Sequence, residues 1–374
     1  MYRETFAADY SRLEKTPFTR DRLRKLSCVV IGAGALGNEV ARILGLLGTS
    51  KVTVVDPDLV EATNLPRSIF FWGEKTLGQN KASALAAAAG GVFPETSWIP
   101  MKREIADVGF QCLTDAVLLF SCVDSDLARL EIAYISQKLR IPTVDGGLGR
   151  QNYSHGRVTY FPGSANQACY GCMLSPRKRR ELLELWQTTL RPCGPSNDDL
   201  ENELISTPTM AGVVGAIQVE LGLRSLFQAR EGLPVSSRSL EIQIHPSRRM
   251  EDFAIPVSAD CPFHQDETHL KALPRPDATF EELLDATGGD TVLLDWPVCV
   301  EAKCMKCEKR WPPMKRLAVL RRGGSCPACG ASSILELQTI RAIGRDSSWL
   351  REVPSALQLP ADHLYTVSTR PQTA

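Results

Sequence analysis

The chain has 374 residues, and its 43 lysines and arginines balance 43 aspartates and glutamates. This length favours two or three domains, and a hydrophobic share of 43% is ordinary for a folded protein. The balanced charge argues against general affinity for nucleic acid or membrane surfaces. We expect no membrane-spanning helix, because no run approaches the roughly 20 apolar residues that one needs, and the charged N-terminus is unlike a secretory signal. We therefore expect a cytoplasmic protein whose twelve cysteines stay reduced.

Strands and helices are predicted to alternate through the first two thirds of the chain. The β-branched apolar runs at 27–31 and 51–55 are typical of buried strands, and the apolar spacing of 38–47 is typical of a helix. Further helices are expected at 80–89, 127–139 and 210–227, and further strands at 116–121, 141–144 and 157–161. This alternation predicts an α/β fold with a doubly wound, Rossmann-like, mainly parallel sheet and helices on both faces.

Two changes in composition divide the rest of the sequence. A polar stretch with several prolines and acids interrupts the α/β pattern, and a proline-containing linker follows near 272–278. We predict a first domain over 1–270 that includes a crossover segment at 176–206. The second predicted domain covers 271–374 and contains a zinc ribbon at 304–329.

A glycine-rich turn joins the first predicted strand to the first long helix. Gly32, Gly34 and Gly37 form the pattern G-x-G-x-x-G, in which the backbone can approach a phosphate at the N-terminus of a helix. Asp56 ends the next strand, 22 residues after Gly34, where its carboxylate can accept from ribose hydroxyls. Taken alone, this pattern most often indicates NAD or FAD.

Charged and polar residues after Asp56 change the expected ligand. The sequence continues with Asp58, Asn64, Arg67, Lys81 and Asp124. A dehydrogenase has no need for an arginine and a lysine at these places, but a nucleotidyl transferase needs cations to neutralise the triphosphate and hold the leaving pyrophosphate. An aspartate after the strand at 116–121 can hold Mg²⁺.

The order of these motifs resembles the ThiF/MoeB/HesA family and the adenylation domains of ubiquitin-activating (E1) enzymes. The motifs are G-x-G-x-x-G, D-x-D, N-L-x-R, G-x-x-K, D-x-x-x-A-R and Val-Asp-Gly-Gly at 144–147, and the match spans roughly 10 to 264. The resemblance implies that Asp56 holds the ribose of ATP. It implies that Asn64, Arg67 and Lys81 contact the phosphates, and that Asp124 binds Mg²⁺ or orients the nucleotide. Ser68 departs from the family pattern, which usually has glutamine there.

The resemblance also implies a homodimer. Arg12 resembles the N-terminal arginine that reaches the triphosphate of the partner subunit, although a solvated helix arginine is an equal alternative. The apolar helix predicted at 210–227 is a candidate for part of the dimer surface.

Eight cysteine and histidine residues form two predicted zinc sites. Cys169, Cys172, Cys261 and His264 provide four ligands, and family members have a structural zinc at these places, usually with four cysteines. The second set is Cys304, Cys307, Cys326 and Cys329, whose spacing is that of a zinc ribbon and is not explained by a single redox pair. The basic residues between its two pairs could bind acidic protein or RNA, but a solvated face is the favoured interpretation.

Cys193 is the one cysteine with a possible catalytic role. It lies in the crossover segment, where E1 enzymes have a cysteine that accepts the activated C-terminus as a thioester, but relatives often place theirs nearer 206–210. An ordinary loop thiol is an equal alternative, and Arg191 would lower the pKa of a nucleophile. Cys28 and Cys122 are expected to be packing residues, and Cys112 and Cys299 give no functional signal.

The leading hypothesis is an enzyme that adenylates the C-terminal carboxylate of a ubiquitin-like or sulfur-carrier protein with ATP and Mg²⁺. The acyl group would then pass to Cys193, for transfer to an E2-like conjugating protein, or to an external sulfur donor. The alternatives are adenylation of a tRNA-bound or small-peptide carboxylate, a non-catalytic E1-like scaffold, and an NAD-dependent oxidoreductase. The last is disfavoured by the charges after Asp56, and the scaffold by the presence of Arg67, Lys81 and Asp124.

Overall fold

The computed structural model describes residues 8–149, 152–187, 206–264, 270–317, 319–320 and 324–369. The chain divides into two compact units. Unit 1 comprises Met1–Ile105, Asp115–Tyr170 and Leu204–Ser258, and unit 2 comprises Ala106–Thr114, Gly171–Glu203 and Ala259–Ala374. The predicted boundary at 270 divides the sequence once and stays a prediction, whereas each unit is assembled from three stretches of chain.

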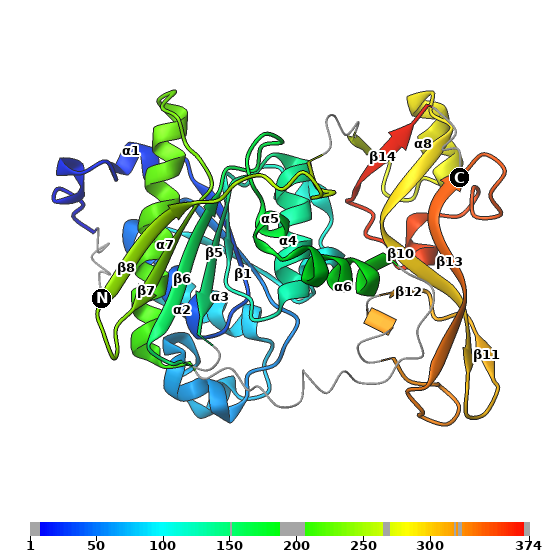
Figure 1. Cartoon of the computed structure of the whole chain (residues 1–374), viewed down its shortest axis with the longest axis horizontal. Coiled ribbons are helices and arrows are strands. Elements are labelled where there is room, and N and C mark those ends of the chain that lie inside the picture. The colour runs from blue at the N-terminus through cyan, green and yellow to red at the C-terminus, as the bar shows by residue number, and fades with distance from the viewer. Residues whose placement is uncertain are drawn as a thin grey trace, which may run out of the picture. The chain divides into compact units, whose positions relative to one another are not determined.

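Unit 1 is built on an eight-stranded sheet in the order β3-β2-β1-β4-β5-β6-β7-β8 (Figure 1). Its strands are β1 (Ser27–Ile31), β2 (Lys51–Val55), β3 (Ser97–Met101), β4 (Leu118–Ser121), β5 (Thr143–Leu148), β6 (His155–Phe161), β7 (Arg238–Gln243) and β8 (Arg249–Ala254). Its helices are α1 (Arg20–Leu23), α2 (Ala35–Leu47), α3 (Lys81–Val92), α4 (Asp126–Leu139) and α7 (Pro208–Arg230). The first five strands are parallel and the last three antiparallel, which confirms a Rossmann-like, mainly parallel sheet.

The two faces of this sheet are covered by different helices. Side chains alternate along a strand, so Val144 of β5 points to one face and its neighbours Thr143 and Asp145 to the other. Val144 packs against Gly222 of α7, whereas Thr143 and Asp145 line a pocket together with residues of α4. The strands contribute near-continuous buried runs, as expected for a parallel sheet covered on both sides.

Helix α7 differs from expectation because it is long and apolar enough, by length and composition, to cross a membrane. Of its most apolar window, 61% is buried inside the fold, as in a core helix. It begins at the N-cap Thr207, whose side chain accepts from the Met210 N–H, with Pro208 in the first turn. Its largest exposed apolar side chain is Val213, so the helix offers little of its apolar surface to a dimer partner.

Unit 2 contains a second antiparallel sheet around one long strand. Its strands are β9 (Leu270–Ala272), β10 (Thr291–Cys304), β11 (Arg310–Trp311), β12 (Lys315–Arg316), β13 (Ile334–Gly344) and β14 (Leu364–Ser368). Its helices are α5 (Tyr170–Met173, which starts at the last residue of unit 1), α6 (Pro176–Gln187) and α8 (Phe280–Thr287). β10 and β13 run side by side, and β11, β12 and β14 also pair with β10 (Figure 1).

The segment 106–114, which connects β3 to β4 in the chain, is part of unit 2. The ring of Phe110 lies 4.1 Å from that of His363, and the Gln111 N–H donates to the Asp362 carbonyl at 3.0 Å. Arg316 of β12 donates to both carboxylate oxygens of Asp107, at 2.6 and 3.2 Å. The C-terminal region therefore includes a segment from the middle of the α/β sequence.

Candidate nucleotide site and metal centres

The glycine-rich turn forms a close-fitting loop between β1 and α2. Gly32 has φ of +92°, and a Cβ there would lie 2.6 Å from the Cys122 carbonyl oxygen. A Cβ on Gly37 would lie 1.9 Å from the Gly32 carbonyl oxygen, so helix and loop approach too closely for any side chain. Gly34 is the N-cap of α2, makes no side-chain cap and has open space at its Cβ position. The first N–H groups of this thirteen-residue helix are therefore suited to an anion.

Asp56 anchors that loop from the end of β2. Its carboxylate accepts from the N–H groups of Ala33 at 2.6 Å and Asp58 at 2.8 Å. Burial raises the pKa of Asp56, and these two N–H groups act in the opposite direction. Each carboxylate oxygen keeps a second lone pair, so the side chain can also accept from the two hydroxyls of a ribose.

Lys81 lies at the start of α3, opposite Asp58. Its ammonium is 3.0 Å from the Asp58 carboxylate, and the lysine is mostly buried while the aspartate is largely exposed. Asn80 caps α3 by accepting from the Ser83 N–H, and its amide donates to the carbonyls of Asp56 and Asp58 at 2.8 and 3.1 Å. Asn80 was not predicted as a site residue, although it occupies the position before the lysine in the G-x-x-K motif. It fixes Lys81 next to the loop that Asp56 terminates.

Asn64 and Arg67 come from one 3-10 helix, η2 (Ala62–Arg67). Asn64 is buried and accepts from the Glu61 N–H at 2.9 Å, as half of a capping box. This contact fixes the start of η2, so a phosphate contact would have to use the amide nitrogen of Asn64. Arg67 is half-buried, donates to the Thr63 carbonyl at 3.2 Å and contacts Ser206.

Asp124 and Arg129 follow β4 but lie in unlike surroundings. Asp124 is exposed, as a metal or nucleotide ligand requires. Arg129 of α4 is buried and donates to Asp145 at 3.0 Å, to the Val123 carbonyl at 2.7 Å and to the Gly146 carbonyl at 3.2 Å. Burial opposes its charge, but Asp145 outweighs this and raises the pKa of Arg129 above its usual value. The arginine of the D-x-x-x-A-R motif thus holds the strand ends together.

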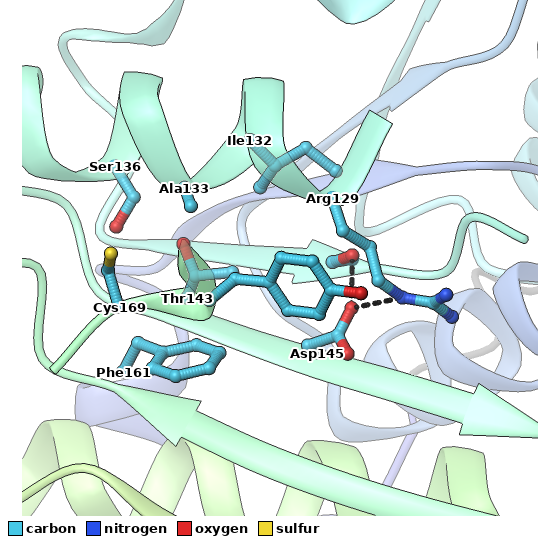
Figure 2. Close-up of a pocket in the computed structure, with 10 residues that line it drawn as sticks. Arg129, Ile132, Ala133, Ser136, Thr143, Asp145, Phe161 and Cys169 are labelled. Carbon is cyan, nitrogen blue, oxygen red and sulfur yellow. Dashed lines mark hydrogen bonds and ion pairs between the residues drawn. The ribbon is translucent and has the colours of Figure 1, made fainter. Parts of the chain in front are cut away.

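Asp145 is the centre of this buried network. It also accepts from the Ser121 hydroxyl at 2.7 Å and from Arg157 at 3.2 Å. Figure 2 shows Arg129 and Asp145 at one end of a small pocket, with Ile132, Ala133 and Ser136 of α4 above it and Phe161 of β6 below. The pocket contains none of the residues predicted to hold the nucleotide. Asp145 belongs to the Val-Asp-Gly-Gly motif at 144–147, but the sequence did not predict it as a site residue.

Gln218 is a second polar residue that the sequence did not single out. It lies in α7, is fully buried, and donates to the carbonyls of Ser121 and Val144 at 2.9 and 2.8 Å. A Cβ on Gly146 would lie 2.5 Å from its side-chain oxygen. The sequence signal that could have identified Gln218 is a lone amide in an apolar helix, because a buried amide must find hydrogen-bond partners.

Two of the predicted residues are not brought into this arrangement. Arg12 is exposed at the N-cap position of η1 (Leu13–Lys15), and its action in trans stays a prediction. Cys193 lies outside the described residues. Of the cysteines expected to be packing residues, Cys28 is buried, and burial raises its pKa to about 12. Cys122 is half-buried, and its thiol donates to Gln218 at 3.8 Å.

The first predicted zinc set is brought together. One ligand atom from each of Cys169, Cys172, Cys261 and His264 lies within 4.8 Å of the others, and Cys172 Sγ is 3.0 Å from His264 Nε2. Gly171 lies between the first two ligands, where a Cβ would contact Cys261 Sγ at 3.0 Å. Arg179 of α6 donates to the Gly171 carbonyl at 3.0 Å and so fixes the knuckle. Three thiolates and one imidazole suit a closed tetrahedral Zn²⁺ site.

The second set forms the ribbon tip at the end of β10. The Sγ atoms of Cys304 and Cys329 are 3.6 Å apart, as are those of Cys307 and Cys326. With Zn–S bonds of about 2.3 Å, two sulfurs of a tetrahedral site lie about 3.8 Å apart, so the spacing fits zinc. The N–H groups of Lys306 and Ala328 point at Cys304 and Cys326, both at 3.4 Å. Backbone N–H donation, led by that of Cys307, lowers the pKa of Cys304 to about 6, which favours the thiolate that binds metal.

The comparisons with known proteins agree with the motifs. The chain is 23% identical over 292 residues to ubiquitin-like modifier-activating enzyme 5 of Arabidopsis thaliana, a match that covers 73% of this chain and 64% of that protein. It is 25% identical over 155 residues to molybdopterin-synthase adenylyltransferase of Salmonella typhimurium, covering 41% and 61%. The chain thus spans less than two thirds of the length of these relatives.

Solved structures show the same fold. Escherichia coli MccB, in a complex with AMPCPP and selenomethionine MccA, superposes with a TM-score of 0.50 at 17% identity, covering 66% of this chain and 68% of that one. The model of the ThiF family matches residues 10–263, which include the glycine-rich turn, the charged residues after it and the three cysteines of the first metal set. The chain belongs to the ThiF family.

Proposed function

We propose that this protein uses ATP to adenylate the C-terminal carboxylate of a ubiquitin-like or sulfur-carrier protein. The observation that carries the proposal is the grouping of Asp56, Lys81 and Asp124 with the uncapped start of α2 at the carboxyl ends of β1, β2 and β4. In open α/β sheets this edge is where ligands bind. The names of the relatives, which include an activating enzyme and an adenylyltransferase, support the same reaction class.

Several groups of the chain suit the parts of ATP. The open position at Gly34 leaves room for phosphate, and Asp56 has lone pairs for the ribose. Arg67 and Lys81 supply positive charge, and Asp124 is exposed for Mg²⁺. The metal would neutralise phosphate charge when bound.

The reaction needs little covalent participation from the protein. A carboxylate oxygen of the carrier attacks the α-phosphorus, the bond to the bridging oxygen breaks, and pyrophosphate leaves with Mg²⁺, so that an acyl-adenylate remains. The carboxylate is already ionised and needs no general base. Lys81 and Arg67 stabilise the charge that develops on the leaving group, and the loop between β1 and α2 positions the nucleotide.

The later steps rest on residues that the structure does not describe. In the proposal, the acyl group passes to Cys193 and then to an E2-like protein, or directly to a sulfur donor. Cys193→Ala separates these routes: pyrophosphate exchange should be intact, while a thiol-reducible adduct with the carrier should be lost. An adduct that survives in Cys193→Ala would assign the thioester to another cysteine.

The proposed function includes a homodimer in the cytoplasm with Arg12 acting in trans. Mixing Arg12→Ala with Lys81→Ala protomers should restore part of the exchange activity, because one of the two sites in a mixed dimer is then intact. Full exchange by a monomer in light scattering would contradict the dimer and the trans arginine together.

The experiment that tests the adenylation itself is ATP–pyrophosphate exchange with candidate small proteins ending in Gly-Gly. Exchange that requires the carrier's free carboxylate supports the proposal. Tight binding of NAD with no binding of ATP would favour an oxidoreductase. Exchange with a short peptide, or with a tRNA that bears a free carboxylate, in place of the carrier would move the substrate to the alternative class.

A further inference from the structure

The tip of unit 2 differs in charge from the rest of the chain. From Glu301 to Arg341 the sequence has nine lysines and arginines against three glutamates, within a chain whose net charge is zero. The rest of the molecule is therefore net negative. A positive patch attracts negatively charged partners, so the ribbon tip and the strands that carry it are a candidate interaction surface.

The strand register sorts this region into two faces. Ala302 of β10 pairs with Trp311 of β11 and Glu336 of β13, so these three side chains share one face. That face is buried, because Ala302 and Trp311 pack with Leu317, Leu320 and Ile334. This small core fixes the positions of the strands and leaves the opposite face to solvent.

The opposite face has charged and apolar side chains together. Lys303 pairs in register with Arg310 and Leu335, and Leu337 lies at the register shift of β13 between the pairs Ala302–Glu336 and Glu301–Gln338. Leu337 is 39% exposed, and Met305 at the adjoining knuckle is 59% exposed. Together with the neighbouring lysines these residues form what we call the ribbon face: Lys303, Met305, Lys306, Lys309, Arg310 and Leu337.

The charges of the ribbon face are only partly neutralised. Lys303 pairs with Glu308 at 3.6 Å, and Arg310 with Glu301 at 3.4 Å. Lys306 and Lys309 are exposed and form no ion pair with any residue in the described part of the chain. Lys306 and Lys309, one on each side of Cys307, are thus available to a carboxylate partner. The zinc knuckle fixes their backbone before a partner binds.

We propose that the ribbon face binds an acidic protein segment in which apolar side chains stand between the carboxylates. The exposed lysines attract the acids, and Met305 and Leu337 receive the apolar side chains, since an adaptable methionine is frequent at such surfaces. The aromatic ring nearest the tip, Trp311, faces the small core, whereas single-stranded RNA is usually held by stacking on exposed rings.

The test uses the full chain loaded with zinc and two fluorescein-labelled peptides. One has repeated Asp-Glu-Leu triplets, and the matched peptide has repeated Asp-Glu-Ser triplets. We expect the leucine peptide to bind about tenfold more tightly, in fluorescence anisotropy, than the serine peptide. Met305→Ser/Leu337→Ser should remove that difference and leave the salt dependence of binding unchanged, because it changes no charge.

Charge variants provide the second arm. Lys306→Glu/Lys309→Glu should weaken both peptides by at least about tenfold and flatten their salt dependence. The matched control is Lys271→Glu/Arg351→Glu, which makes the same charge change at exposed positions of unit 2 outside the ribbon face and should bind as the wild type does. If Lys306→Glu/Lys309→Glu lowers the zinc content, Lys303→Glu/Arg310→Glu on the strands makes the same test.

Three results would overturn the proposal. Equal binding of the leucine and serine peptides would show that the ribbon face binds by charge alone and does not recognise apolar side chains. Equal losses in the control variant would place the binding elsewhere. Tighter binding of a single-stranded RNA than of either peptide, abolished by the same lysine variants, would make the ribbon face a nucleic-acid surface. The adenylation reaction is not used in any arm, so its failure would leave this result intact.

Discussion

The nucleotide-binding sheet and the ribbon tip obtain their stability from different sources. Among the described residues, one apolar cluster of unit 1 contains 31 buried residues, contributed by strands, helices and the 3-10 segments after Asp58. The core beneath the ribbon tip contains five, next to a larger core of fourteen around β10 and β14. Apolar burial can therefore hold the sheet and its charged residues in place, whereas so small a cluster as that of the tip needs a metal.

The comparison also explains how charge is used in the two regions. In unit 1, Arg129 and Asp145 are buried on the face of the sheet that α4 covers, where Arg129 donates to Asp145 and to the carbonyls of Val123 and Gly146. At the ribbon tip the lysines stay exposed because there is no interior to receive them. The buried pair organises a site, while the exposed cations are available to a partner.

Removing one ribbon ligand should produce the largest effect. Cys307→Ser should lower the zinc content from two ions to one per chain and unfold the tip, because structural zinc contributes on the order of 10 kcal/mol in small zinc domains. Cys28→Ala, at a buried cysteine inside the large core, should cost only about 1 kcal/mol. Elemental analysis and hydrogen exchange check this, and protection at the tip that survives loss of the metal would contradict it.

Replacing the buried Arg129 should produce the second-largest effect on stability. Arg129→Met leaves Asp145 buried with less compensation, so the free energy of unfolding should fall by about 3–5 kcal/mol. Arg67→Met, at a half-buried arginine whose contacts lie near the surface, should cost less than about 1 kcal/mol. Urea unfolding of the two variants measures the difference, and similar losses would show that the network around Asp145 is no more important than a surface contact.

Replacing Lys81, an accessible cation, should affect catalysis strongly and stability only slightly. Lys81→Ala should lower the rate of pyrophosphate exchange by about 10²–10³ while changing the unfolding free energy by less than about 1 kcal/mol, because its partner Asp58 is largely exposed. Lys51→Ala, at a lysine of β2 that is also paired with an exposed aspartate, is the control and should retain full exchange. Equal rates in the two variants would remove Lys81 from the site.

The smallest expected effect is a pH dependence from Asp56. Burial raises its pKa above 3.8, so the folded state takes up a proton more readily than the unfolded state. The stability contributed by this group is present below its unfolded pKa and is lost as the pH rises through its folded pKa. The affinity for ATP should instead increase as the pH rises through the folded pKa of Asp56, because the ionised carboxylate accepts from the ribose hydroxyls. Asp56→Asn should remove both dependences in calorimetry.

The sequence predicted those parts of the molecule that local patterns determine. The β-branched runs, the glycine-rich turn and the spacing of the cysteines each have a physical reason that acts over few residues, and the sheet and both metal sets agree with them. Of the last three strands, 157–161 was predicted, whereas β7 and β8 were not. The antiparallel pairing of β6 with β5 was not predicted either, because it depends on a short connection and not on strand composition.

The parts that the sequence could not predict depend on contacts between distant residues. The roles of Asn80, Asp145 and Gln218 follow from which backbone groups the fold brings within reach, and nothing adjacent to them in sequence indicates those partners. The incorporation of 106–114 into unit 2 likewise depends on Arg316, some two hundred residues away. Buried polar groups must be satisfied, but only the folded chain shows by what.

We propose that the charged residues after the glycine-rich turn activate a protein carboxylate with ATP. The most direct measurement is pyrophosphate exchange by the zinc-loaded protein with a carrier ending in Gly-Gly, compared with the same carrier amidated at its C-terminus. We expect exchange with the free carboxylate, none with the amide, and a loss of about 10²–10³ in rate in Lys81→Ala. Exchange that is indifferent to amidation, or unchanged in Lys81→Ala, would contradict this proposal.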